Sequence, residues 1–291
     1  MVIRRVLLDA FGTVFSPREP VFRQYALVAR QYGLQVEEQK VKDGFKLAFK
    51  KWAKDHPLYG KHSTPPLDPR AWWIGVIEQT FQEAGVPSHE LDPVASSLSS
   101  ALVERFHGKE GYDLHADALP FLSALASLPS PSSASSANAP LPFPPPGIVS
   151  NTDPSVSKVL RSLGVLFSGP QGGRGMIREE EVWTTWALES GEKKEGRFWE
   201  EVLRRLRETN GRQDLRAEEV LVVGDELDSD YLVPRSVGFK SLLLRRLSPD
   251  EEHPNASYEE ERHDEGVEEV TSLMEVIEYI KRENARRVET I

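Results

Sequence analysis

The sequence predicts an α/β fold, a doubly wound parallel sheet with an all-helical domain inserted after the first strand. Apolar strand patterns alternate with helical patterns through most of the chain, as in a parallel sheet. Two of the predicted strands, residues 2–8 and 219–224, end in a carboxylate, at Asp9 and Asp225. The carboxyl ends of parallel strands lie at one edge of the sheet, where ligands bind. We therefore expect both acidic ends to lie at that edge and to share a cation.

Composition excludes several classes of protein. The chain has 291 residues, no cysteine, and 36 basic against 46 acidic residues, for a net charge of −10 at pH 7. This charge argues against nucleic acid or an anionic membrane as a partner. Disulfides, thiolate catalysis and cysteine-bound zinc are excluded. The apolar run near the start is too short for a signal peptide, and none approaches the roughly 18 residues of a membrane span. We expect a soluble cytoplasmic protein, with the nucleus as the alternative compartment and an unknown oligomeric state.

The first strand leads into a long region of helical spacing. The apolar positions predict four helices, and Gly33 is a typical C-cap for the first; the helices cover residues 21–32, 36–53, 71–81 and 91–107. Their aromatic stripes favour a helix-packing core. No strand pattern occurs here, so residues 17–110 are expected to form an all-helical domain.

The rest of the chain returns to the sheet. Residues 129–146 are of low complexity, rich in serine, proline and alanine, and predict a surface loop. The other expected elements are strands at 147–150, 219–224 and 239–244, helices at 112–128, 156–163 and 267–281, a mainly helical region at 182–208, and a surface loop at 249–266. Residues 231–237 connect the strand before Asp225 to the strand at 239–244. The predicted core thus comprises residues 1–16 and 111–291.

Four short motifs occur in a characteristic order. They are Asp9-x-Phe11-Gly12-Thr13 after the first strand, Ser150-Asn151 after a middle strand, Lys193 before a helix, and Gly224-Asp225 followed by Asp230. Together they resemble the haloacid dehalogenase-like hydrolase superfamily, in the subgroup whose helical cap follows the first motif. The resemblance implies a Rossmann-like core, a cap at residues 17–110, a small phosphorylated substrate and Mg²⁺ as the cofactor.

The resemblance also implies a role for each motif residue. Asp9 would be the nucleophile, forming an aspartyl-phosphate. Asp9, Asp225 and the carbonyl of Phe11 would bind Mg²⁺, with Asp230 in a supporting position. Ser150 and the backbone of Asn151 would hold a phosphate oxygen, Lys193 would neutralise charge, and the hydroxyl of Thr13 would line the loop after Asp9.

Three of these assignments have open alternatives. Ser150 could cap the following helix, and Thr13 could be a turn residue. The family usually has Lys-Pro-Asp where this chain has Lys193-Lys194-Glu195, so Lys194 is an alternative site lysine. Among residues of the helical domain, Lys46, Lys50, Trp72 and Trp73 are candidates for lining a substrate pocket.

One departure from the family pattern concerns Phe11. Phosphatases of the superfamily carry a general acid here, and a phenyl ring carries no proton; general acid catalysis is typically worth about 10²–10⁴-fold. A weak Mg²⁺-dependent hydrolase is therefore the first hypothesis, and a binding or regulatory protein of little turnover is the second. The third is a metal-independent 2-haloacid dehalogenase, since those enzymes have an aromatic residue here and release halide without a proton. Asp225 counts against the third because it would add uncompensated charge beside Asp9. The dehalogenases' halide-binding arginine also has no clear counterpart; near its expected place stand Lys40, Lys42 and Lys46.

Overall fold

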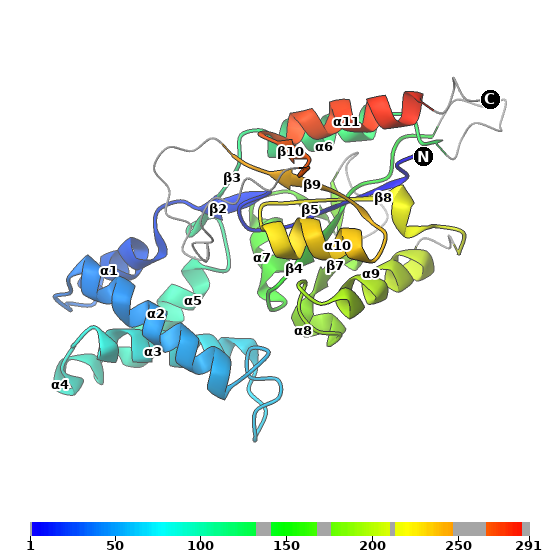
Figure 1. Ribbon diagram of the computed structural model, residues 1–291. Coiled ribbons are helices and arrows are strands. Elements are labelled where there is room, and N and C mark those ends of the chain that lie inside the picture. Colours follow the sequence, from blue (N-terminus) through cyan, green and yellow to red (C-terminus); the bar gives the residue numbers. More distant parts are fainter. Residues whose placement is uncertain (1, 132–140, 168–175, 210–212, 247–265, 287–291) are drawn as a thin grey trace.

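The centre of the protein is a six-stranded parallel sheet (Figure 1). The structure is a computed structural model and describes residues 2–131, 141–167, 176–209, 213–246 and 266–286. In spatial order the strands are β10 (Glu269–Val270), β9 (Lys240–Leu244), β8 (Val220–Gly224), β1 (Arg5–Leu8), β4 (Gly147–Ser150) and β7 (Val182–Thr184). The predicted α/β fold class is confirmed.

Helices cover both faces of this sheet (Figure 1). One face packs against α6 (Ala118–Ser127), α7 (Ser155–Ser162) and α11 (Leu273–Ala285). The other packs against α8 (Thr185–Leu188), α9 (Gly196–Thr209) and α10 (Val233–Ser236). A parallel sheet that is buried on both faces favours strands that are mostly apolar, which explains the near-continuous apolar runs in the sequence.

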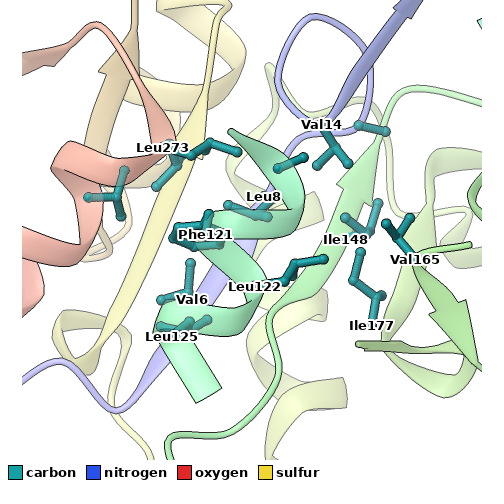
Figure 2. Close-up of a cluster of buried hydrophobic side chains, with 14 of the residues drawn as sticks. Val6, Leu8, Val14, Phe121, Leu122, Leu125, Ile148, Val165, Ile177 and Leu273 are labelled. Atoms are coloured by element: carbon teal, nitrogen blue, oxygen red, sulfur yellow. The ribbon is translucent and has the colours of Figure 1, made fainter. Parts of the chain in front are cut away.

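The central strand β1 is held from both sides. Val6 and Leu8 belong to the apolar cluster under α6, whereas Leu7 belongs to the cluster under α9, because successive side chains of a strand point to opposite faces. Figure 2 shows the α6 side chains, Phe121 among them, lying over Val6 and Leu8. Full burial of each such side chain stabilises the fold by roughly 1.5–3 kcal/mol. This packing fixes the end of β1, and with it Asp9.

A helical block lies between two short strands. Strand β2 (Phe15–Pro17) pairs antiparallel with β3 (Tyr112–Leu114), so the chain leaves and returns at one place. Between them lie α1 (Val21–Gln31), α2 (Glu38–Asp55), α3 (Pro69–Glu83), α4 (Ser88–Leu91) and α5 (Ala95–Arg105). They pack around apolar clusters of their own, to one side of the sheet (Figure 1). The start of α3 is fixed by Asp68, whose side chain accepts a hydrogen bond from the backbone N–H of Ala71 at 2.8 Å.

Several short strands were not predicted. Residues 182–184 were expected to be helical, but they form β7, which pairs with β4 and buries Trp183. The start of the predicted closing helix contains β10, and the start of the predicted helix 112–128 contains β3. The short strands β5 (Leu166–Phe167) and β6 (Ile177–Arg178) pair with each other. These strands are only two or three residues long, and their pairing with neighbouring strands defines them.

The two predicted surface loops lie partly outside the described residues. Of the low-complexity segment, residues 132–140 are outside, and its two ends form a bridge between Pro129 and Pro142. Phe143, within the same segment, is 2% exposed and packs in the core below α6. Most of 249–266 is also outside the described residues. Where the structure describes the chain, it contains no helix that is both long and apolar enough to cross a membrane.

Candidate active site

Three aspartates meet at the carboxyl ends of neighbouring strands. Asp9 directly follows β1, Asp225 directly follows β8, and Asp230 lies in the helical turn Leu227–Leu232 beyond it. One oxygen of each carboxylate lies within 4.8 Å of the other two. Because β1 pairs with β8, the backbone N–H of Asp9 donates to the carbonyl of Val223 at 2.9 Å. The sheet itself therefore brings Asp9 and Asp225 together.

A buried lysine completes this cluster. The Nζ of Lys193 contacts Oδ1 of Asp9 and lies 2.5 Å from Oδ1 of Asp230. Its backbone is also held, since its N–H donates to Oδ1 of Asn151 at 2.9 Å and its carbonyl accepts from Nε1 of Trp199 at 2.7 Å. Lys194 instead has a side chain that is 64% exposed and pairs with Glu192. Of the two candidate lysines, Lys193 is the one that reaches the aspartates.

Two glycines make room for the carboxylates. Gly12 has a φ of +75°, and a Cβ there would lie 2.2 Å from Oδ2 of Asp225. A Cβ on Gly224 would lie 2.3 Å from Oδ2 of Asp230. Thr13, fully buried next to Gly12, donates its hydroxyl to Oδ1 of Asp225 at 3.1 Å. The loop after β1 is thus fitted closely to Asp225, and a side chain at either glycine would displace a carboxylate.

Burial and mutual repulsion raise the pKa values of the two strand-end aspartates. Burial is the largest cause for Asp9, whose pKa is held well above its usual range; Lys193 opposes the shift, and Asp230 and Asp225 add to it. Burial, followed by the charges of Asp230 and Glu226, raises the pKa of Asp225 to about 7. For Lys193, burial acts to lower the pKa, but the charges of Asp230 and Asp9 outweigh it and raise the value. Three clustered carboxylates, two of them buried, face one ammonium and leave negative charge that a cation would balance.

The donor set fits Mg²⁺. All candidate ligands are oxygens, and Mg²⁺ is typically held by one or two carboxylates together with water. Both oxygens of Asp230 already have partners, because Oδ1 pairs with Lys193 and Oδ2 accepts from the backbone N–H of Glu226 at 3.1 Å. All three aspartates could still supply an oxygen to such an ion, and Asp9 and Asp225 are the two that directly follow strands.

The other predicted site residues lie along the same edge. Ser150 is the last residue of β4 and is 1% exposed, and the following Asn151 turns its side chain to the N–H of Lys193. Phe11 packs edge-on against Phe15 and Tyr112, with ring centroids 4.7 and 5.5 Å away. An aromatic cluster thus surrounds the position where a phosphatase would carry its acid.

The four residues of the helical block proposed to line a pocket differ in their surroundings. Trp72 is 1% exposed, and its indole N–H donates to the carbonyl of His56, so it is a core residue of the block. Lys46 and Lys50 are exposed on α2. Trp73 does reach across, donating to Oδ2 of Asp153 at 2.8 Å.

Three residues that contact the site segments were not predicted from the sequence. Tyr59 and Lys61, between α2 and α3, hydrogen-bond to the backbone carbonyls of Asn151 and Trp186, both at 2.8 Å. No sequence pattern marks them, because the contact joins distant segments. Arg246 donates to the carbonyls of Gly12 at 3.1 Å and Thr13 at 2.6 Å. Its place two residues after the end of a predicted strand is the signal that could have identified it.

Comparison with known proteins finds relatives and structural neighbours that include haloacid dehalogenase-like hydrolases. No protein-family profile matches the chain. The haloacid dehalogenase-like hydrolase domain-containing protein 3 of Danio rerio is 27% identical over 253 residues, which cover 86% of this chain and 88% of that one. Among solved structures, the HAD-hydrolase YfnB of Bacillus subtilis, bound to magnesium, has a TM-score of 0.57 at 14% identity and covers 97% of this chain and 100% of its own. The L-2-haloacid dehalogenase RSc1362 has a TM-score of 0.59 at 14% identity, over 97% and 100% of the two chains. At these identities the solved structures show a shared fold.

Proposed function

Because the chain belongs to the haloacid dehalogenase-like hydrolase superfamily, we propose that it is a Mg²⁺-dependent hydrolase of a small phosphorylated substrate, with Asp9 as the nucleophile. The observation that carries the proposal is the meeting of Asp9, Asp225 and Asp230, with the ammonium of Lys193 paired to Asp9 and Asp230. A buried carboxylate at a strand end, with fixed positive charge beside it, suits attack on a phosphoryl group.

In the proposed reaction each site residue has a separate role. Asp9 forms an oxygen–phosphorus bond as the bond from phosphorus to the leaving oxygen breaks, and water then hydrolyses the aspartyl-phosphate. Lys193 neutralises charge on Asp9 and on the phosphoryl oxygens, and Ser150 with the N–H of Asn151 holds one of those oxygens. Asp230 keeps Lys193 in place. The helical block, residues 17–110, acts as the cap that covers the site and excludes water.

A magnesium ion would neutralise charge on the transferred group and orient it. The YfnB neighbour was solved bound to magnesium. We propose the same metal for this chain because Asp9, Asp225 and the carbonyl of Phe11 offer the oxygen ligands that Mg²⁺ prefers.

Phe11 limits the reaction. Its ring lies among Phe15 and Tyr112 and has no proton for the departing alcohol. We expect substrates with good leaving groups to react and simple alkyl phosphates to react slowly. The same observation favours a second candidate, a protein that binds a phosphorylated ligand with little turnover. A dehalogenase is the third candidate, and the charge of Asp225 beside Asp9 argues against it in the absence of a cation.

Hydrolysis of an activated aryl phosphate, measured with Mg²⁺ and with chelator, tests the proposal. We expect turnover with Mg²⁺ that is lost in Asp9→Asn and kept in Asp55→Asn, a matched change on the exposed end of α2. Mg²⁺ binding without turnover would indicate the binding protein, and release of halide from a 2-haloacid in chelator would indicate the dehalogenase.

A further inference from the structure

The loop between α2 and α3, residues 56–68, touches two segments that flank Lys193. We call it the tip loop. The hydroxyl of Tyr59 donates to the carbonyl of Asn151 at 2.8 Å, directly after β4. The Nζ of Lys61 donates to the carbonyl of Trp186 at 2.8 Å and pairs with Oε1 of Glu189 at 2.6 Å.

Lys61 is held from several directions. Besides its two oxygen partners, its ammonium lies 3.9 Å from the centroid of the Trp186 ring, a cation–π distance. His62 lies beside it, with Nε2 3.5 Å from Oε2 of Glu189. Hydrogen bonds from Lys61 and His62 lower the pKa of Glu189, so this carboxylate stays ionised near neutral pH. The tip loop is therefore clamped to the segment that leads into Lys193.

The backbone is strained at this junction. Among the residues that the structure describes, glycines aside, left-handed φ angles occur at Leu58 (+53°), Tyr59 (+53°) and Glu189 (+52°). Side chains other than glycine adopt this conformation rarely, and such residues cluster at functional sites where the surrounding contacts hold them. All three lie where the tip loop meets the core.

A short path leads from Tyr59 to the nucleophile. Tyr59 holds the backbone carbonyl of Asn151; the side chain of Asn151 accepts from the N–H of Lys193; and the ammonium of Lys193 contacts Asp9. Burial raises the pKa of Tyr59, so its hydroxyl remains a donor at any working pH. Its ring is fixed as well, lying 5.1 Å from the ring of Trp72.

Resting on the proposed function, we propose that Tyr59 is a positioning residue for catalysis, which aligns Lys193 on Asp9 through Asn151 when the tip loop is clamped by Lys61 to Glu189. The contact of the tip loop with the core and the alignment of Lys193 on Asp9 then occur together. A substrate that is small enough to leave the contacts between the tip loop and the core intact is hydrolysed. A larger substrate that separates the tip loop from the core leaves Lys193 misaligned.

Two variants test this inference, each with a matched control. Tyr59→Phe removes the hydroxyl group and keeps the aromatic ring. Lys61→Met removes the ammonium group that binds Trp186 and Glu189 and keeps an unbranched apolar side chain. Tyr279→Phe on α11 and Lys51→Met, which breaks an exposed pair with Asp55 on α2, are the controls. The measurements are kcat and KM for an aryl phosphate at saturating Mg²⁺, and the exchange rate of the Lys193 amide hydrogen by NMR. The exchange rate needs no turnover.

We expect Tyr59→Phe to lower kcat about three- to tenfold, the effect of losing one hydrogen bond, with KM changed less than about twofold. Exchange of the Lys193 amide should rise by a similar factor in Tyr59→Phe and Lys61→Met and stay unchanged in both controls. If the wild-type protein shows no turnover but this exchange still rises, the proposed function fails and the positioning role stands.

Three results would overturn the inference. One is unchanged Lys193 exchange in both test variants. Another is a fall in kcat without faster exchange, because the lysine would then not be the intermediary. The last is an equal rise in exchange at a core amide such as that of Val222, in both test variants, because Tyr59 and Lys61 would then only stabilise the fold.

Discussion

The ammonium group of Lys193 contacts the carboxylate of Asp9, although 184 positions separate the two residues in the chain. Both side chains are buried, with Lys193 1% and Asp9 8% exposed. An ion pair in such a place is maintained by its partners, because either charge alone would carry a large desolvation penalty. Both the chemistry of the site and its stability therefore depend on this pair.

Replacing Lys193 with methionine should remove activity and destabilise the metal-free protein. Asp9 and Asp230 would lose their shared cation, and breaking a buried pair typically costs about 3–5 kcal/mol. Urea unfolding at pH 8, without metal, measures the change. Lys194→Met is the matched control, since that exposed side chain should contribute less than about 1 kcal/mol. Comparable losses in the two variants would contradict the assignment of the site lysine.

Magnesium should stabilise the protein more as the pH rises. The pKa of Asp225 is raised to about 7 in the folded protein, so between about pH 4 and 7 the folded state binds more protons than the unfolded state. Raising the pH through this window therefore destabilises the metal-free protein. Mg²⁺ binds the ionised carboxylate, so its stabilising effect should increase up to about pH 8.

Thermal unfolding with Mg²⁺ and with chelator, from pH 5 to 8.5, checks this dependence. In Asp225→Asn the difference in Tm between the two conditions should be small at every pH. A difference that shrinks as the pH rises would be inconsistent with a carboxylate metal site.

Replacing Phe11 with aspartate should increase hydrolysis of alkyl phosphates. The new carboxyl group would stand where the superfamily's phosphatases carry their acid, and general acid catalysis supplies about 10²–10⁴-fold for poor leaving groups. Activated aryl phosphates should gain little, because their leaving groups need no proton. Comparing kcat/KM for the two substrates measures the effect. An equal gain for both, or none for either, would count against the assignment of a phosphate site.

Replacing Gly12 with alanine should weaken Mg²⁺ binding beyond the effect of backbone strain alone. The new Cβ would lie 2.2 Å from the present position of Oδ2 of Asp225 and would displace that carboxylate. Gly33→Ala is the matched control: Gly33 has a φ of +85°, and a Cβ there meets nothing within 4 Å. Both variants should lose roughly 1–2 kcal/mol of stability to left-handed strain, but only Gly12→Ala should raise the Kd for Mg²⁺. Calorimetric titration separates the two effects, and equal Kd values would argue against a metal at Asp225.

Replacing Arg5 with methionine should destabilise the sheet. Arg5 on β1 pairs with Glu181 at 2.5 Å, and the two side chains are 2% and 0% exposed. Removing the arginine leaves the glutamate charge buried, at about 3–5 kcal/mol. Unfolding in urea measures this cost, and the double variant Arg5→Met, Glu181→Leu should recover much of the loss. A double variant that is no more stable than Arg5→Met would show that burial of the charge is not the cause.

The sequence by itself determined the layers of the fold and the strand ends that carry acids. Near-continuous apolar runs at β1, β4, β8 and β9 are visible in the chain because a strand buried on both faces is mostly apolar. Asp9, Asp225 and the Ser150-Asn151 pair follow such runs directly, so the order of residues along the chain is enough to infer their common edge. The helices between residues 17 and 110 were likewise predicted from the spacing of their apolar positions.

Only the tertiary structure decided the remaining points. Lys193 and Lys194 are alike in sequence, and burial against Asp9 and Asp230 distinguishes them. Strand β7 is only three residues long, and its pairing with β4 distinguishes it from the start of the helix that was predicted there. The contacts of Tyr59 and Lys61 with the core join segments far apart in the chain, and periodicity reports only neighbours along one element. Local pattern determines what each element is, whereas the side chains that meet at the site are decided by packing between elements.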